Sequence, residues 1–249
     1  MSKTLHLTSN IKKMFQTLKK PATCLLLNGP RKEMTAFETE IWNSSQKRVT
    51  VDGGYDIYKQ SINNSPKPPS LIFLGDSDSS TYKDFANNNL NKSSTEIITA
   101  FDQDYTDFHK CLNYLFEKEV NQLVFVLSAN SLSRFDHIIN QLHVLYEFRK
   151  SEVTCVIDSG DEIVMLNALA ENTENKVIFE DLNNKCSLFS LSLSGGKAVT
   201  NGLAWDLDDS LSLGFQTLQS TSNYNVKTSV EVKVLESQGL MFHCTIPKK

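Results

Sequence analysis

The chain has 249 residues, of which 40% are hydrophobic, enough for one large domain or two smaller ones with buried cores. Its formal net charge of −4 at pH 7 argues against a nucleic-acid-binding protein, which would normally carry a basic face. Its apolar runs are too short to cross a bilayer, and its five cysteines form no CxxC pair, so we expect a cytoplasmic protein with reduced thiols and no membrane association.

Targeting to an organelle is the alternative for the first part of the chain. Lysines precede the first acidic residue, Glu33, as in a transit peptide. The stretch is poor in arginine, however, and runs directly into the strand-like segment 23–27. We therefore keep the cytoplasm as the expectation.

Short apolar runs alternate with amphipathic segments through the first 150 residues. The apolar runs are typical of buried parallel strands and cover residues 24–27, 48–51, 71–74, 96–99 and 123–127. Helices are expected over residues 32–42, 55–62, 81–87, 107–118 and 134–150. This alternation predicts an α/β domain with an open, Rossmann-like parallel sheet and helices on both faces. Ligands of such sheets bind beyond the carboxyl ends of the strands.

The pattern changes after about residue 151, where short β-rich runs follow one another without a convincing helix. These runs cover residues 153–157, 162–166, 176–179, 188–193, 198–203, 211–218, 229–234 and 240–246. Such spacing predicts an antiparallel sandwich or barrel. We expect an α/β domain over residues 1–155 and an all-β antiparallel sandwich over residues 156–249, with a turn at Asp158-Ser-Gly160.

Acidic residues gather where two of the predicted parallel strands end. Asp76 and Asp78 follow the strand at 71–74, and Asp102, Asp104 and Asp107 follow the strand at 96–99. Close carboxylates raise each other's pKa unless a cation or a row of donors lies between them. Mg²⁺ takes carboxylate and phosphate oxygens as ligands. The pattern therefore indicates a metal or phosphate site, the alternative being ordinary turn formers and helix caps.

Other polar residues flank these clusters. Thr106 is the expected N-cap of the helix at 107–118, so the first backbone amides would face the site. Lys110 could neutralise a phosphate or form an i,i+3 ion pair with Asp107. Arg134 and Asp136 open the next helix, either as site residues or as caps. His137 lacks a second ligand at metal spacing and is expected to be structural.

Three further segments could contribute to a site, and two of them have a second interpretation. The glycines of Asp52-Gly-Gly54 would let backbone approach a nucleotide, or form a plain turn. Trp205 lies in a polar neighbourhood and could stack on a flat heterocycle, or pack in a core. The run Ser220-Thr-Ser-Asn223 offers small hydrogen-bonding groups after a strand. No Walker loop, G-x-G-x-x-G or G-x-S-x-G motif is present, so phosphate binding would depend on metal and carboxylates.

Taken in order, these motifs resemble the thiamin pyrophosphokinases, the eukaryotic type in particular, over nearly the whole chain. The motifs are Asp52-Gly-Gly54, Gly75-Asp-Ser-Asp-Ser79, Asp102-Gln-Asp-Tyr-Thr-Asp107 with Lys110, Arg134-Phe-Asp-His137, Thr200-Asn-Gly-Leu-Ala-Trp-Asp206 and Leu218-Gln-Ser-Thr-Ser-Asn223. The resemblance implies transfer of the pyrophosphoryl group of ATP to the hydroxyl of thiamine, with Mg²⁺, giving thiamine diphosphate and AMP. It also implies a homodimer whose active sites lie between subunits.

The resemblance assigns a role to each matching position. The residues implied to be catalytic are Asp76, Asp78, Asp107 and Asp136, the first three by holding Mg²⁺ and Asp136 as a candidate proton acceptor. Those implied to bind ATP are Asp52, Gly53, Ser79, Thr106, Lys110 and Arg134. Those implied to bind thiamine are Gln103 and, from the partner subunit, Trp205, Ser220, Ser222 and Asn223.

Two places depart from the family pattern. The segment 127–133 has none of the glycines that usually precede the Arg-x-Asp motif, and Tyr55 and Asp56 replace the common Ala-Asn. The alternatives left open are a Mg²⁺-dependent phosphohydrolase, a nucleotidyltransferase for another alcohol, and a catalytically silent thiamine-binding protein. The identity of the products would distinguish them.

Overall fold

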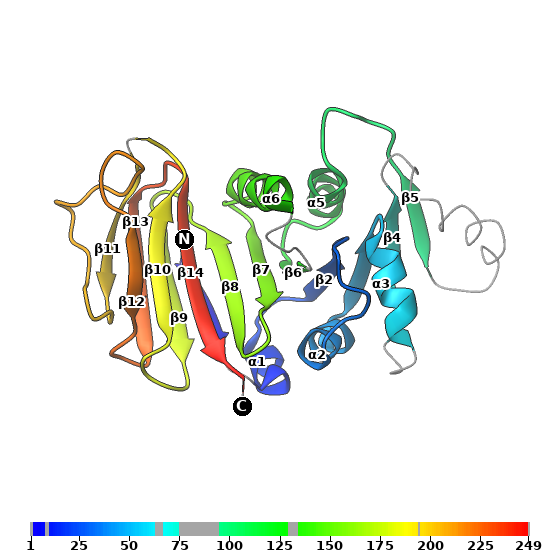
Figure 1. The fold of residues 1–249 in the computed structure, drawn as a ribbon, viewed down its shortest axis with the longest axis horizontal. Helices are drawn as coiled ribbons and strands as arrows, with labels where there is room; N and C mark the ends of the chain where they lie inside the picture. The colour runs from blue at the N-terminus through cyan, green and yellow to red at the C-terminus, as the bar shows by residue number, and fades with distance from the viewer. Residues whose placement is uncertain are drawn as a thin grey trace. The chain divides into compact units, whose positions relative to one another are not determined.

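The computed structural model describes residues 2–7, 10–62, 67–74, 95–128, 134–193 and 195–248 (Figure 1). Its contacts divide the chain into two compact units, one of residues 18–144 and one that joins residues 1–17 to residues 145–249. The domain boundary expected at residue 155 stays a prediction.

The unit of residues 18–144 is built on a parallel sheet. Its strands are β2 Ala22–Leu26, β3 Lys47–Val51, β4 Leu71–Leu74, β5 Glu96–Thr99 and β6 Leu123–Leu127. They lie in the order β6-β2-β3-β4-β5, and the neighbouring pairs are parallel. All residues of β2 and β6 are buried, which explains their nearly continuous apolar sequences. The strands predicted in this half of the chain are confirmed.

Strand β2 is the point from which the chain proceeds in both directions across this sheet. It pairs with β3 on one side, and the chain continues outward to β4 and β5. It then returns to form β6 on the other side of β2. In an open α/β sheet, the loops that leave the carboxyl ends of two such strands diverge and form a crevice. The order of the strands therefore places the expected ligand site of this unit beside the end of β2.

Helices cover both faces of this sheet. They are α2 Ala36–Ser44, α3 Gly54–Ser61, α5 Asp107–Lys118 and α6 Phe135–Glu147. Figure 1 shows α5 on the face opposite to α2 and α3. The buried face of α5 consists of Phe108, Cys111, Leu112 and Leu115 at helical spacing, with His109 beside it. The helix predicted at residues 81–87 lies outside the described residues.

Helix α2 begins four residues later than the sequence pattern suggested. Thr35 caps it, because its hydroxyl accepts the Glu38 backbone N–H and the Glu38 carboxylate accepts the Thr35 backbone N–H. Glu38 is fully buried, and the Arg31 guanidinium lies 2.5 Å from its Oε1. This buried pair draws the 31–35 segment away from the helix, so the predicted start at residue 32 is wrong.

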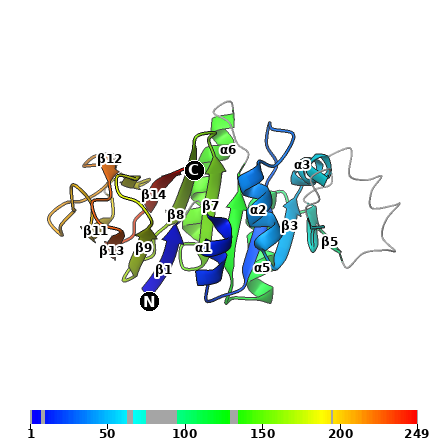
Figure 2. The same cartoon turned by 90° about the horizontal axis from the view of Figure 1, so that it is seen from below.

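The other unit contains two β-sheets, which Figures 1 and 2 show as separate layers. One sheet has the order β12-β10-β14-β8-β7 and is antiparallel. Its strands are β7 Glu152–Asp158, β8 Glu162–Ala168, β10 Lys185–Ser190, β12 Ser220–Tyr224 and β14 Leu240–Pro247. The other has the order β1-β9-β13-β11, with strands β1 Ser2–Leu7, β9 Glu174–Phe179, β11 Lys197–Asn201 and β13 Ser229–Glu236. The antiparallel all-β prediction is confirmed, although β1 adds one parallel pair with β9.

Three parts of this unit differ from the sequence-based expectation. Strand β1 and helix α1, Ile11–Thr17, form where we predicted no element. The strand predicted at 211–218 is wrong, because this segment makes tight turns and only isolated bridges at Leu213. The backbone there crosses Gly195 so closely that an added Cβ would lie 1.4 Å from the Leu213 carbonyl oxygen. The pairing strand instead is β12, whose polar sequence gave no strand signal.

Within the described ranges, no helix is long and apolar enough to span a membrane.

We expect Gly54→Ala to lower the free energy of unfolding by about 2 kcal/mol, because the added Cβ would lie 2.1 Å from the backbone carbonyl oxygen of Leu26. Urea unfolding of both proteins measures this loss. Gly53→Ala is the matched control, since its Cβ would first meet the side-chain amide of Asn28, which can rotate away. Equal losses in the two variants would contradict the assignment of the clash to backbone packing.

Candidate functional site

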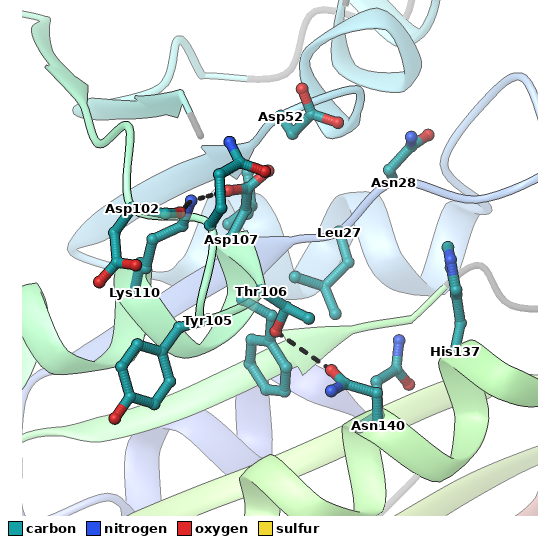
Figure 3. Close-up of a pocket in the computed structure, with 14 residues that line it drawn as sticks. Leu27, Asn28, Asp52, Asp102, Tyr105, Thr106, Asp107, Lys110, His137 and Asn140 are labelled. Atoms are coloured by element: carbon teal, nitrogen blue, oxygen red, sulfur yellow. Dashed lines mark hydrogen bonds and ion pairs between the residues drawn. The ribbon is translucent and has the colours of Figure 1, made fainter. Parts of the chain in front are cut away.

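A cavity of about 340 Å³ opens at the carboxyl edge of the parallel sheet, within the unit of residues 18–144 (Figure 3). Its size is in the range of small-molecule sites in proteins. It is lined by Leu27, Asn28, Val51, Asp52, Asp102, Gln103, Tyr105, Thr106, Asp107, Phe108, Lys110, His137, Asn140 and Gln141. These residues lie at or just after the ends of β2, β3 and β5 or in the first two turns of α5 and α6, as expected for a crevice beside the end of β2.

The segment after β3 brings Asp52 to the cavity in an unusual backbone conformation. Asp52 has φ of 46°, in the left-handed region, and its N–H donates to the Phe73 carbonyl at 2.9 Å. Gly54 then allows α3 to start against the backbone of Leu26. At Gly53 an added Cβ would lie 2.6 Å from the Asn28 amide, so this glycine leaves room for a side chain of the cavity wall. The two glycines therefore serve different contacts.

Lys110 is held within the acidic segment that precedes α5. Its ammonium lies 2.6 Å from Asp107 Oδ1 and donates to the carbonyl oxygens of Ala100 (3.1 Å) and Asp102 (2.9 Å). Only 9% of the Lys110 side chain is exposed, so this is no freely solvated i,i+3 pair. Because these three acceptors match the three donors of an ammonium group, Lys110 fixes the loop after β5 and the Asp107 carboxylate.

Thr106 is the N-cap residue of α5, as predicted, but its side chain makes no capping hydrogen bond. Its hydroxyl instead donates to Asn140 Oδ1 on α6 at 3.1 Å, the contact drawn at the floor of the cavity in Figure 3. This bond ties the start of α5 to the first turns of α6. It also leaves Thr106 and Asn140 together on the cavity wall.

Arg134 and Asp136 form a two-pronged ion pair at the start of α6. Arg134 Nε donates to Asp136 Oδ1 at 3.1 Å and its Nη2 donates to Oδ2 at 2.8 Å, while Nη2 also contacts His137 Nε2. The hydrogen bond from Arg134 is the main cause that lowers the pKa of Asp136 from 3.8 to about 2. Because a general base works best with a pKa near the working pH, this pairing does not favour Asp136 as a proton acceptor.

The residues predicted for thiamine lie mostly in the other unit. Trp205 is on the loop after β11, and its side chain is 62% exposed, so the core-packing alternative is wrong. Ser220, Ser222 and Asn223 are on β12. The β10–β12 register is irregular at this point, and Ser222 has φ of 61° and is exposed, whereas Asn223 is buried. Such an irregularity turns individual side chains out of a strand.

The structure thus gathers part of the predicted site. It brings Asp52, Gln103, Thr106, Asp107 and Lys110 to one cavity. The predicted Asp76, Asp78 and Ser79 lie outside the described residues. Arg134 and Asp136 do not line the cavity, although the neighbouring His137 does. Among the described residues, no three acidic, His or Cys side chains are grouped closely enough to hold a metal ion.

Several wall residues were not among the sequence-based candidates. They are Asn28, Tyr105, His137, Asn140 and Gln141, together with the apolar Leu27, Val51 and Phe108. Asn28 lies two residues past the end of β2, at the edge where the sequence pattern already places ligands, but no substrate was assigned to it. The α6 residues had no such signal, since helical spacing alone does not tell which turn faces a cavity.

We expect carbon-detected NMR to give the Asp136 carboxylate a pKa of about 2, against an ordinary value of 3.8. Because the folded-state pKa is the lower one, the pair stabilises the fold above pH 3.8 and is lost as the pH falls through about 2. Arg134→Gln should raise the pKa of Asp136 toward 3.8, while Lys150→Gln should leave it unchanged. A normal Asp136 pKa in the unmodified protein would contradict the pairing.

Comparison with known proteins agrees with this geometry. The model of the thiamin pyrophosphokinase catalytic domain matches residues 39–157. The chain is 28% identical over 213 residues to thiamine pyrophosphokinase 1 of Arabidopsis thaliana, covering 79% of this chain and 78% of the relative. It is 26% identical over 230 residues to thiamin pyrophosphokinase 1 of Caenorhabditis elegans, covering 89% and 88%.

Solved structures agree in fold. The chain is similar to the thiamin pyrophosphokinase of Candida albicans, with a TM-score of 0.73 and 18% identity over 98% of this chain and 93% of that one. The yeast enzyme gives a TM-score of 0.64 with 17% identity, over 98% and 91%. The family match includes the loops after β3 and β5 that build the cavity. In sequence and in fold, the chain is therefore similar to the thiamin pyrophosphokinases.

Proposed function

We propose that this protein is a thiamine diphosphokinase, which transfers the pyrophosphoryl group of ATP to the hydroxyl of thiamine and releases AMP. The observation that carries the proposal is the cavity at the carboxyl edge of the sheet. It collects Asp52, Gln103, Thr106, Asp107 and Lys110 from separate segments, and the family resemblance assigns Asp107 to Mg²⁺ and the other four to a substrate. The match of residues 39–157 to the catalytic domain of the thiamin pyrophosphokinases supports the same reaction.

The cavity is lined by negatively charged side chains, so a bound polyphosphate needs a cation to offset the repulsion. Asp52, Asp102 and Asp107 line it, and the Lys110 ammonium is already engaged with the loop after β5. We propose that Asp107, with Asp76 and Asp78, holds Mg²⁺, whose preferred ligands are carboxylate and phosphate oxygens. Bound there, Mg²⁺ would neutralise charge on the transferring phosphates.

The reaction requires alignment more than covalent catalysis. The thiamine oxygen forms a bond to the β-phosphorus, the bond from that phosphorus to the bridging α–β oxygen breaks, and AMP leaves with this oxygen. Asp52, Gly53, Ser79, Thr106, Lys110 and Arg134 are proposed to position ATP. The hydroxyl proton must leave as the new bond forms, and Asp136 stays a candidate acceptor only if binding of phosphate to Arg134 restores its ordinary pKa.

Thiamine is proposed to bind between two copies of the chain. Gln103 would contact it from the cavity, while Trp205, Ser220, Ser222 and Asn223 would belong to the partner of a homodimer. The exposure of the Trp205 ring supports this role, because an indole left in solvent offers a face for stacking. All five cysteines are buried and unpaired, which supports our proposal of a reducing compartment such as the cytoplasm.

Purified protein with ATP, MgCl₂ and thiamine should give equal amounts of AMP and thiamine diphosphate, as identified by ³¹P NMR. Asp107→Asn should lower kcat by about 100-fold, because one of the carboxylates proposed to hold Mg²⁺ against the phosphates is lost, and chelation of the metal should abolish turnover. Asp161→Asn, on an exposed turn, is the matched control and should leave kcat unchanged. Phosphate release without thiamine would instead indicate a hydrolase, and thiamine binding without turnover a silent binding protein.

A mixing experiment tests whether each site uses two subunits. Asp107→Asn and Trp205→Ala chains, each weakly active alone, should regain about a quarter of the unmodified activity after exchange of subunits, because each mixed dimer has one intact site. Sites built within single chains would gain nothing, since every chain carries one lesion. Light scattering of the same samples checks the dimer itself.

A further inference from the structure

The Trp205 ring is exposed although its backbone is firmly held. The Trp205 N–H donates to Asn223 Oδ1 at 3.2 Å, and the Trp205 carbonyl accepts from Asn223 Nδ2 at 2.8 Å. One side chain from β12 thus binds both polar backbone groups of this residue. Next to it, the Ala204 N–H donates to the Tyr224 carbonyl at 2.9 Å. Trp205 is therefore attached to the end of β12 and is no free loop residue.

Asn223 itself has little capacity left for a ligand. Its Oδ1 accepts a second hydrogen bond, from the Tyr224 N–H at 2.9 Å, so both lone pairs of this oxygen are used. The two backbone donors also fix which end of the amide is oxygen. The residue is only 2% exposed. A molecule stacked on the indole of Trp205 would thus meet little of the Asn223 side chain.

The rest of the loop is fixed independently. The Asp206 carboxylate accepts from the Thr200 hydroxyl (3.0 Å) and from the backbone N–H groups of Gly202 (3.1 Å) and Leu203 (3.0 Å). The Tyr224 ring meets the Trp205 ring edge-on, with centroids 5.5 Å apart and planes at 82°. Asp206 thus shapes the loop before Trp205, whereas Asn223 and Tyr224 set the direction in which the indole projects.

We propose that Asn223 is a positioning residue, which holds the Trp205 indole ready for stacking and does not contact thiamine. The proposal rests on the proposed thiamine site and changes the role of one residue in it. Stacking on a ring that is already held avoids the entropy loss of ordering the loop when the ligand binds. Loss of Asn223 therefore weakens thiamine binding only as long as Trp205 is present.

A double-mutant cycle on the full chain tests this, with the Kd of thiamine measured by calorimetry. Trp205→Ala should raise Kd roughly tenfold, as expected for loss of one stacking contact. Asn223→Ala alone should raise it several-fold, but in the Trp205→Ala background it should add less than about twofold. An equal rise in both backgrounds would show direct contact with thiamine and overturn the proposal.

A second measurement does not depend on the ligand. The chain has two tryptophans, and Trp42 is fully buried with its indole N–H donating to the Lys67 carbonyl. Fast depolarisation of the tryptophan fluorescence therefore reports motion of the Trp205 indole. Time-resolved anisotropy should show a new nanosecond component in Asn223→Ala. Unchanged anisotropy would overturn the proposal. If the unmodified protein bound no thiamine, the proposed function would fail while the anisotropy still decided the role of Asn223.

Asn225→Ala is the matched control for stability. Asn225 is also fully buried and pairs with Leu203 in a β-bridge, but its Nδ2 donates to the carbonyls of Asp181 (3.0 Å) and Lys227 (2.9 Å) and not to Trp205. Both variants should unfold at lower temperature, because each leaves buried backbone groups unpaired. Only Asn223→Ala should change the anisotropy and the Kd of thiamine. The same changes in Asn225→Ala would show a general loosening of β12 and overturn the specific role.

Discussion

The parallel pairing of β2 with β3 on one side and with β6 on the other is the constraint on which the candidate site depends. It turns the carboxyl ends of all the neighbouring strands to one edge, so residues distant in sequence reach one cavity. The close contact of α3 with the β2 backbone at Gly54 then fixes where Asp52 stands. The strand order thus decides which segments meet at this edge, and the side chains on those segments then decide what the cavity can bind.

Buried apolar runs made most of the fold predictable. The strands β2 to β6 and the apolar face of α5 follow directly from such runs, because the burial that forms them is the signal in the sequence. Strand β12 could not be found in this way, since Ser220–Tyr224 is polar and lies at an edge of its sheet. The apolar residues at 211–218 predicted a strand that does not form. Close backbone contacts at glycine shape that segment, and it has isolated bridges in place of a strand ladder.

The site was predictable to the extent that it follows strand ends. The acidic residue after β3 and those before α5 could be placed at the cavity by this rule, whereas the wall supplied by α6 depends on how that helix is rotated. Sequence also does not tell which polar side chains face a ligand and which hold the backbone. Lys110, Thr106 and Asn223 all make strong contacts within their own chain, and these contacts give each of them a role in shaping the site.

The different contacts of Gly53 and Gly54 decide which amino-acid substitutions each position can accept during evolution. At position 54 the obstacle is a backbone atom of β2, and no exchange of a neighbouring side chain removes a backbone atom. At position 53 the obstacle is the amide of Asn28, so a larger residue there becomes acceptable once residue 28 becomes smaller. Positions 28 and 53 should therefore change together among descendants of this sequence, whereas position 54 should stay glycine by itself.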